Sequence, residues 1–393
     1  MSSGVHPISQ EAALLERLRL VGPASRPTLE QDTGLGRKVV HERVALLADL
    51  GLVAEGTLGQ STGGRMPRLL EFAGGPGVVA MAEMNVDSVT VGVADLRGEI
   101  LTQLEHPLSL GEGPDRTVAA LADALRDVAA TVDRPLWGVG VGVLAPVDVE
   151  AGTVFGGHLF DGTVMEGWDG LAVRRRLADE LGVAVWVDNE VNLMMLGELR
   201  AGLARGRQNA LFVKTGPSIG AGIALRGSLQ RGGSAAGEVG HLRVPDEDDL
   251  PCWCGNTCCL AAFLAPEQLA REQAAGDDWD TVLRRAGVRL GRVVASVVTL
   301  LDPTLVVLGG TLVEAGSPVV DLVRGEVERR AFVTAQRDLE VTVSPLSDRA
   351  GLVGAAFLAA DALFSPDALA AWLPLGTPAA LGVGLHDVLA RRS

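Results

Sequence analysis

The sequence predicts an α/β protein in which an N-terminal winged helix-turn-helix is followed by a body of two α/β lobes. Three observations support this. Residues 1–75 contain three helical patterns and then two short strand patterns. Residues 76–393 alternate strands with helices twice over. All four cysteines lie close to a histidine within residues 237–260. We therefore expect two domains, over residues 1–75 and 76–393.

The composition is that of a globular protein with an acidic body. The 393 residues are 47% hydrophobic and 21% charged, and the formal net charge is -15. That charge argues against a uniformly nucleic-acid-coated surface. Residues 1–75, however, hold eight basic and eight acidic side chains and are neutral. A neutral domain binds phosphates if its basic side chains share one face.

Neither a secretory signal nor a membrane span is expected. The N-terminus lacks a charged segment followed by an apolar core. The most apolar later stretch, residues 294–308, is interrupted by Asp302-Pro303 and is too short to cross a bilayer. We expect a cytoplasmic protein without a membrane partner, whose cysteines stay reduced.

The N-terminal domain carries the parts of a helix-turn-helix. Residues 8–20 place apolar side chains at helical spacing, and residues 28–33 form a short second helix. A glycine-containing turn at residues 34–36 leads into a third amphipathic helix at residues 37–50. This order is typical of proteins whose last helix enters the major groove of DNA.

The exposed basic side chains of this domain are the candidate DNA contacts. Two short strands, residues 52–55 and 68–72, flank a loop that we interpret as a wing, with its tip able to enter a minor groove. Arginine binding to guanine is the commonest specific contact in the major groove. The alternative is a helical module for protein interaction or oligomerisation. The candidates on the third helix and the wing are Arg37, Lys38, His41, Arg43 and Arg65.

The body alternates strands and helices in two successive halves. In the first half we expect strands at residues 77–95 (two, with a turn near 85–87), 99–104, 137–144 and 184–187, and helices at residues 116–132 and 171–181. In the second half we expect strands at residues 210–215, 219–225 and 305–308, and helices at residues 278–301 and 350–360. Two α/β lobes that repeat one arrangement favour a ligand site in the cleft between them. Residues 365–393 receive no assignment.

The cysteine-rich segment predicts a closed structural metal site. It supplies five possible donors, namely His241, Cys252, Cys254, Cys258 and Cys259. Thiolates and an imidazole suit Zn²⁺, and four of them complete a tetrahedron without an open position for water. One donor is therefore surplus, and spacing alone does not identify it. The alternatives are disulfides in a secreted protein or four buried thiols.

Several motifs together resemble the ROK family of repressors and sugar kinases. GEVGH at 237–241 followed by CWCGNTCCL at 252–260 is similar to the family signature. The N-terminal domain resembles that of the family's repressor branch, of the xylose-repressor type. The resemblance implies a two-lobed actin-like ATPase fold, a structural Zn²⁺ and a sugar in the cleft. Supporting matches are GPSIGAG at 216–222, DNEVN at 188–192, VVLGG at 306–310 and AGLVGAA at 350–356.

The resemblance also implies roles for individual residues. It assigns the metal to His241, Cys252, Cys254 and Cys259, and leaves Cys258 where relatives usually carry glycine. It assigns the sugar to Asn189, Glu190, Glu238 and His241, whose amide, carboxylate and imidazole groups suit a hydroxyl-rich ligand. His241 would then serve both sites, with one ring nitrogen on the metal.

Departures from the family's kinases predict a protein that is not an enzyme. The kinases open their body with a D-x-G-G-T phosphate loop, whereas residues 83–87 of this chain are EMNVD. Ser218 replaces a glycine of the second phosphate motif, and Glu190 stands where the kinases carry a catalytic aspartate.

The function expected from these features is that of a sugar-responsive transcriptional regulator. We expect a repressor that binds operator DNA as a homodimer or homotetramer. A ROK-type sugar kinase with an attached DNA-binding domain is the alternative, and a DNA-binding protein that senses no ligand is a third possibility.

Overall fold

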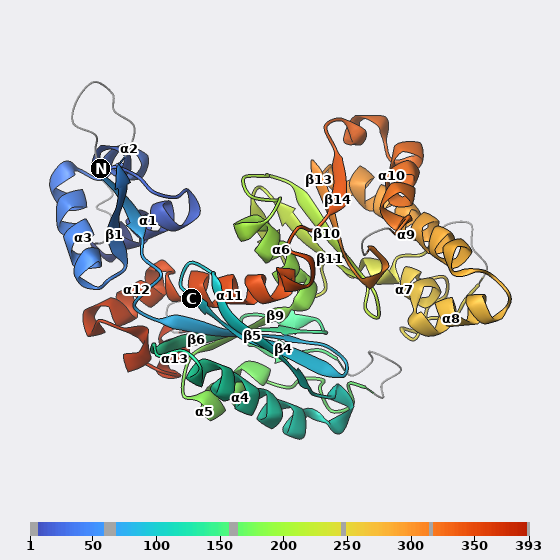
Figure 1. The fold of residues 1–393 in the computed structure, drawn as a ribbon, viewed down its shortest axis with the longest axis horizontal. Coiled ribbons are helices and arrows are strands. Elements are labelled where there is room, and N and C mark those ends of the chain that lie inside the picture. The colour runs from blue at the N-terminus through green and yellow to red at the C-terminus, as the bar shows by residue number, and fades with distance from the viewer. Residues whose placement is uncertain (1–6, 59–67, 157–163, 245–248, 314–316, 391–393) are drawn as a thin grey trace.

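The computed structural model describes residues 7–58, 68–156, 164–244, 249–313 and 317–390. The predicted order of an N-terminal helical domain and two α/β lobes is confirmed (Figure 1). No single helix among the described residues is long and apolar enough to cross a bilayer; one bent pair, residues 347–363 with 366–375, meets that test jointly by length and composition.

The described part of the N-terminal domain consists of three helices and a two-stranded hairpin. The Ser25 hydroxyl accepts a hydrogen bond from the Thr28 backbone N–H and caps the second helix, which ends at Gly34 with φ of 70°. The antiparallel strands pair Val53 with Phe72. The elements are α1 (Pro7–Leu20), α2 (Arg26–Thr33), α3 (Arg37–Asp49), β1 (Val53–Leu58) and β2 (Arg68–Phe72).

The first lobe is built on a five-stranded sheet of order β5-β4-β3-β6-β9. Three antiparallel strands lie on one side, and the last two strands are parallel to β3 and to each other. Its strands are β3 (Val78–Met84), β4 (Ser88–Asp95), β5 (Ile100–Pro107), β6 (Leu136–Val143) and β9 (Val185–Asn189), with a small ribbon of β7 (Val147–Asp148) and β8 (Thr153–Val154). Its helices are α4 (Pro114–Ala130) and α5 (Val173–Leu181).

The second lobe repeats this topology. Its sheet has the order β12-β11-β10-β13-β14, with β10, β11 and β12 antiparallel and β13 and β14 parallel to β10. Its strands are β10 (Ala210–Thr215), β11 (Gly220–Leu225), β12 (Ser228–Gln230), β13 (Leu305–Gly310) and β14 (Glu340–Val343). Its helices are α7 (Leu260–Leu264), α8 (Pro266–Ala274), α9 (Trp279–Leu301) and α10 (Val319–Arg330).

Two helices, α6 (Glu190–Ala201) and α11 (Ala350–Leu363), pack against each other between the lobes (Figure 1). Helix α11 packs on the first sheet, while α6 packs on the second. Glycines permit the close approach, because a Cβ on Gly354 would lie 1.8 Å from the Leu193 carbonyl oxygen. The helix that starts at the cleft is thus fixed against both lobes.

The N-terminal domain and the first lobe share one hydrophobic core. The C-terminal helices α12 (Pro366–Trp372) and α13 (Gly384–Ala390) complete it. Phe72 of β2 packs edge-on against Phe364 with ring centroids 5.2 Å apart, and Trp137 of β6 packs against Trp372 at 5.5 Å. Because aromatic packing spans the junction, the N-terminal domain is seated on the body.

Candidate functional site

The candidate sugar residues meet at a cavity between the two lobes. Its volume is about 60 Å³. Ligand pockets usually hold about 300–1,000 Å³, so a sugar would enter only as the lobes separate. The lining includes all four predicted sugar residues, and among its other members are Pro146, Ser218, Trp253 and Ala261.

Asn189 caps the N-terminus of α6. Its Oδ1 accepts hydrogen bonds from the backbone N–H groups of Val191 and Asn192, and its Nδ2 donates to the Ala145 carbonyl oxygen at 3.1 Å. These bonds use most of the amide's capacity and leave one N–H for a ligand. Asn189 therefore positions Glu190, the first residue of the helix.

Glu190 ties the N-terminus of α6 to the second lobe. Its carboxylate is 2% exposed and accepts hydrogen bonds from Lys214 Nζ at 2.6 Å and Ser218 Oγ at 2.8 Å. Lys214 also donates to Ser218 Oγ at 3.0 Å. Both carboxylate oxygens are engaged, and Lys214 neutralises the charge of Glu190. In a kinase, Glu190 would have to act as the base, and this pairing disfavours that role.

Glu238 differs from Glu190 in having an uncommitted carboxylate. It forms no side-chain hydrogen bond or ion pair with another described residue. Burial, and next the negative charge of Glu190, raise the pKa of Glu238. Gly237, with φ of 93°, fixes this segment to β11, because its Cβ would lie 1.8 Å from the Ala221 carbonyl oxygen. Glu238 is thus held at the cavity with open hydrogen-bonding capacity.

A buried carboxyl group, Glu83, stands at the N-terminus of α11. The side chain lies against Gly351 and is 6% exposed. Burial, and then repulsion from Glu190, raise its pKa to about 8. The N-terminus of a helix is a favourable position for an anion such as a phosphate. In this chain the protein's own carboxyl group occupies that position.

We predict that Glu83→Gln flattens part of the pH dependence of stability. Between the ordinary value of 4.5 and about 8, the folded protein keeps a proton that the unfolded chain loses. Stability is therefore lost as pH rises through this window, with a slope of up to about 1.4 kcal/mol per pH unit. Urea unfolding at pH 5 and pH 8 measures this pH dependence. The stability of the variant relative to the wild type should be higher at pH 8 than at pH 5. If the stability difference between pH 5 and pH 8 were the same in the variant and in the wild type, the assignment would be contradicted.

Three cysteines and a histidine form a compact donor cluster. The ligand atoms of His241, Cys252, Cys254 and Cys259 all lie within 4.8 Å of one another. Cys252 Sγ is 3.7 Å from His241 Nδ1, and Cys254 Sγ is 3.6 Å from Cys259 Sγ. A Zn–S bond of about 2.3 Å sets a tetrahedral edge of roughly 3.8 Å, so the cluster fits a four-coordinate metal ion.

The ionisation of these donors is linked to metal binding. Burial lowers the pKa of His241 and so favours the neutral imidazole, which is the form that binds a metal. Burial raises the pKa of the Cys259 thiol to about 12. A bound cation would displace that proton, so metal uptake should release protons.

Cys258 lies apart from the cluster. Its thiol is buried and donates a hydrogen bond to Asp249 Oδ1 at 3.2 Å. Its backbone has a φ of 61°, in the left-handed region that glycine adopts most easily. A glycine at this position, as in the family pattern, would adopt the same backbone conformation.

We predict that Cys258→Gly leaves the metal content unchanged. The substitution relieves a strained φ but removes a buried side chain, so we expect the free energy of unfolding to fall by no more than about 1–2 kcal/mol. Metal analysis of the purified variant measures the bound ion directly. A loss of metal on this substitution would return Cys258 to the ligand set.

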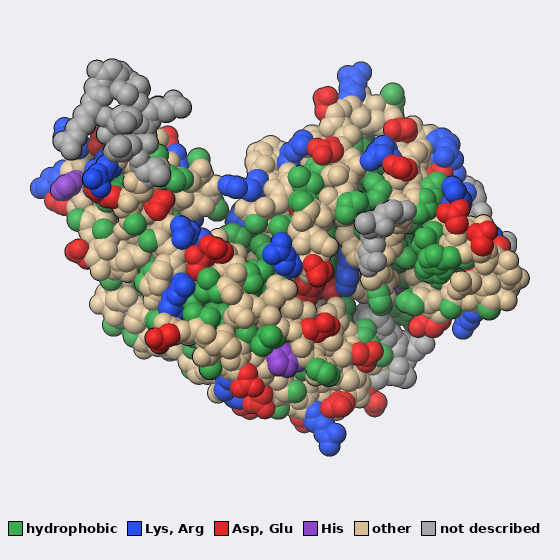
Figure 2. All heavy atoms as spheres, in the orientation of Figure 1, with side chains coloured by type: hydrophobic (Ala, Val, Ile, Leu, Met, Phe, Trp, Pro, Cys, Tyr) green, Lys and Arg blue, Asp and Glu red, His purple; other side chains and the backbone are tan. Residues whose placement is uncertain are grey.

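Three of the five candidate DNA-binding residues gather on the outer end of the N-terminal domain. Arg37, Lys38 and His41 are exposed at the start of α3. They line a surface depression of about 930 Å³ together with Arg26 and Arg68. Basic and histidine side chains are seen on this part of the surface in Figure 2. In a recognition helix, the first turn is the part that reaches base edges.

The other two predicted DNA contacts are Arg43 and Arg65. Arg43 points towards α1, where Nε donates to Gln10 Oε1 at 3.2 Å and Nη1 lies 3.2 Å from Glu11 Oε1. This geometry favours a role in fixing α3 rather than in contacting DNA. Arg65 lies outside the described residues. Sequence reasoning missed Arg26 and Arg68, because only the fold brings α2 and β2 beside α3.

Comparison with known proteins identifies the family of the body. The ROK family model matches residues 81–362. Among curated proteins, a putative xylose repressor of Caldicellulosiruptor sp. is 28% identical over 379 residues, covering 87% of this chain and 93% of its own. A glucokinase of Halalkalibacterium halodurans is 27% identical over 318 residues, covering 70% of this chain and 93% of its own.

Solved structures agree with this fold. A ROK family transcriptional regulator described as a homologue of the Escherichia coli Mlc protein superposes with a TM-score of 0.77 at 21% identity, covering 94% of this chain and 99% of its own. A ROK hexokinase from Thermus thermophilus superposes with a TM-score of 0.59 at 26% identity, covering 72% of this chain and 97% of its own. The two-lobed fold, the matched family model and these relatives establish that the chain belongs to the ROK family.

Proposed function

We propose that this protein is a sugar-responsive transcriptional repressor. It binds operator DNA through α3 and the wing of the N-terminal domain, and a sugar in the cleft between the lobes. The observation that carries the proposal is the interlobe cavity, which is lined by Asn189, Glu190, Glu238 and His241. The helix that starts at this cavity ends beside the N-terminal domain. The repressor relatives support the same reading, since they match the chain over 87–91% of its length.

The proposed sugar contacts follow from hydrogen-bonding capacity. Glu238 has both carboxylate oxygens available for hydroxyl groups. Glu190 has accepted two hydrogen bonds and keeps lone pairs for a ligand. His241 binds Zn²⁺ through Nδ1 and keeps Nε2 for the cleft. Zn²⁺ at His241, Cys252, Cys254 and Cys259 acts as a structural clamp that holds this segment, without a chemical role.

The route from cleft to DNA runs along α6. Glu190 is the first residue of the helix, and Arg200 near its end donates two hydrogen bonds to Asp361 Oδ2, at 2.9 and 2.8 Å. Asp361 Oδ1 accepts a third, from Arg19 of α1 at 2.7 Å. Separation of the lobes around a sugar would move α6, and the shared carboxylate passes this movement to the N-terminal domain. Such coupling requires that the sugar bind the two forms with different affinity.

A sugar kinase with an attached DNA-binding domain is the competing function, and the glucokinase relatives favour it. Lys214 and Ser218 hold the carboxylate of Glu190, and Glu83 fills the anion position at α11. Both contacts disfavour phosphoryl transfer. A coupled ADP-release assay with ATP and a panel of hexoses and pentoses decides between the two. We expect no turnover above background; turnover that disappears in Glu190→Gln would overturn the proposal.

DNA binding is tested most simply by electrophoretic mobility shifts on the DNA upstream of the protein's own gene. We expect specific binding by a homodimer or homotetramer to a pseudo-palindromic site. Arg37→Ala should weaken it by about 1–3 kcal/mol. Arg116→Ala on α4, far from the proposed surface, is the matched control and should bind as the wild type does. Absence of specific binding at modest salt would refute the function. We place the protein in the cytoplasm as part of this proposal.

A further inference from the structure

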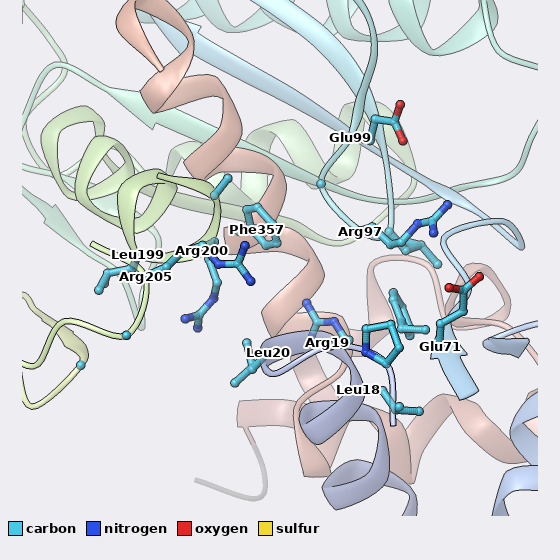
Figure 3. A pocket seen from close by; sticks show the side chains of 18 of the residues that line it. Leu18, Arg19, Leu20, Glu71, Arg97, Glu99, Leu199, Arg200, Arg205 and Phe357 are labelled. Carbon is cyan, nitrogen blue, oxygen red and sulfur yellow. The ribbon is translucent and has the colours of Figure 1, made fainter. Parts of the chain in front are cut away.

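A second and larger cavity lies where the N-terminal domain meets the two lobes (Figure 3). Its volume is about 620 Å³. It is lined by the end of α1, β2, the turn between β4 and β5, the end of α6 with the loop that follows it, and Phe357 of α11. This volume is within the usual range for small-molecule sites, whereas the sugar cavity is nearly closed.

The lining of this interdomain cavity is rich in arginine. Five of the described residues that line it are arginines, and only Glu71 and Glu99 supply lining carboxylates. Four of the arginines pair with carboxylates, on Asp361, Asp95 and Glu340, so Arg205 is the lining arginine without a described carboxylate partner. In Figure 3, Arg19, Arg97, Arg200 and Arg205 extend from separate segments that line the cavity. The five are Arg19, Arg97, Arg200, Arg205 and Arg207.

Several of these guanidinium groups keep unused donors. Arg205 forms no side-chain hydrogen bond or ion pair with another described residue. Arg200 uses Nε and Nη2 on Asp361, which leaves Nη1. Among the described residues, Arg97 donates a side-chain hydrogen bond only from Nε, to Asp95 Oδ2 at 3.3 Å. Arginine presents planar pairs of N–H groups that match the oxygen spacing of carboxylates and phosphates.

We propose that the interdomain cavity binds a small metabolite carrying a carboxylate or phosphate group. The oxyanion contacts Arg205 and the free Nη1 of Arg200, which lie side by side in Figure 3. The uncharged body of the ligand packs against Leu20 and Phe357, which also line the cavity. The site is separate from the sugar cavity, so the protein has two ligand sites, and binding at this one does not depend on the proposed response to sugars.

Occupancy of this cavity would fix the N-terminal domain on the body. Arg19 and Leu20 belong to α1, whereas Arg97, Arg200 and Arg205 belong to the lobes. A ligand whose oxyanion is held by the lobe arginines while its body packs against Leu20 adds contacts across the junction. A ligand that binds one domain orientation better than another shifts the affinity for DNA by the same coupling factor. The anion is therefore a second input to DNA binding.

Isothermal titration calorimetry of the full-length protein in a chloride buffer tests the site. The two probes are inorganic phosphate and malonate, which separate phosphate from carboxylate recognition. We expect saturable binding of at least one probe with a Kd of about 1 mM or tighter. Arg205→Gln should weaken it by about tenfold or more, because a charge-assisted contact is lost. Arg116→Gln, which removes an exposed arginine of α4, is the matched control and should bind with wild-type affinity.

The alternative outcomes are distinct. Absence of saturable heat with both probes, or equal affinity in Arg205→Gln and the wild type, would overturn the proposal. If Arg205 instead contacts the DNA backbone, Arg205→Gln would weaken operator binding and reduce its salt dependence while neither probe binds, which also overturns it. Failure of the sugar response alone would leave the anion titration unaffected.

Discussion

Substitution of Cys259 by serine is expected to abolish zinc binding and to melt residues 237–260. Serine is nearly isosteric and is a favoured residue at the N-cap position, which Cys259 holds in α7. The substitution therefore removes a thiolate with little other damage. Three remaining donors do not close a structural tetrahedron. Because structural zinc contributes folding free energy directly, we expect a loss of at least about 3 kcal/mol.

Metal analysis and thermal unfolding of the same samples measure this effect. The wild type should carry one equivalent of zinc, Cys259→Ser almost none, and Cys258→Gly one equivalent. Chelation of the wild type should lower its melting temperature towards that of Cys259→Ser and leave the variant's nearly unchanged. Retention of zinc in Cys259→Ser, or absence of zinc from the wild type, would contradict the metal site.

Substitution of Asp361 by asparagine is expected to be the second most damaging change. One carboxylate pairs with Arg19 of α1 and Arg200 of α6. Arg19 is 9% exposed, and burial lowers its pKa. Asparagine keeps the shape but leaves this buried cation without its counter-charge. Because the carboxylate itself is 27% exposed, we expect a loss of about 2–3 kcal/mol rather than the full cost of breaking a buried pair.

This substitution should also reduce the effect of the sugar on DNA affinity, since it breaks the link between α6 and α1. Urea unfolding gives the stability, and operator titrations with and without sugar give the coupling. Asp321→Asn is the matched control, because its exposed pair with Arg324 on α10 should contribute no more than about 0.5 kcal/mol. A stable Asp361→Asn protein with wild-type coupling would exclude this route.

Much of the fold was predictable because its signals are local. The alternation of strands and helices predicted eight of the ten strands that the structure describes in the two central sheets, and missed the edge strands β12 and β14. Helices α9 and α11 were expected within a few residues of their observed bounds. In α9, the Asp278 N-cap and the stripe of apolar residues both predict the same helix. The donors of the metal cluster were predictable because they lie within nineteen residues of one another.

Other features depend on contacts that no local pattern encodes. Helix α6 was missed because Glu190 to Leu199 are all buried, so the helix has no polar face to produce a periodic signal. The pairing of Glu190 with Lys214 joins two lobes, and that of Arg43 with Glu11 joins two helices. Residues 366–390 were unassigned because their short helices gain stability only from the shared core.

We propose that one sugar changes the affinity of this protein for its operator through the cleft between the lobes. Fluorescence anisotropy of labelled upstream DNA, titrated with protein in the presence of individual hexoses and pentoses, measures it directly. We expect one sugar to change the operator Kd by about fivefold or more. Glu238→Gln should abolish the response and leave binding without sugar unchanged. Specific DNA binding that no sugar alters, or a response that persists in Glu238→Gln, would contradict the account.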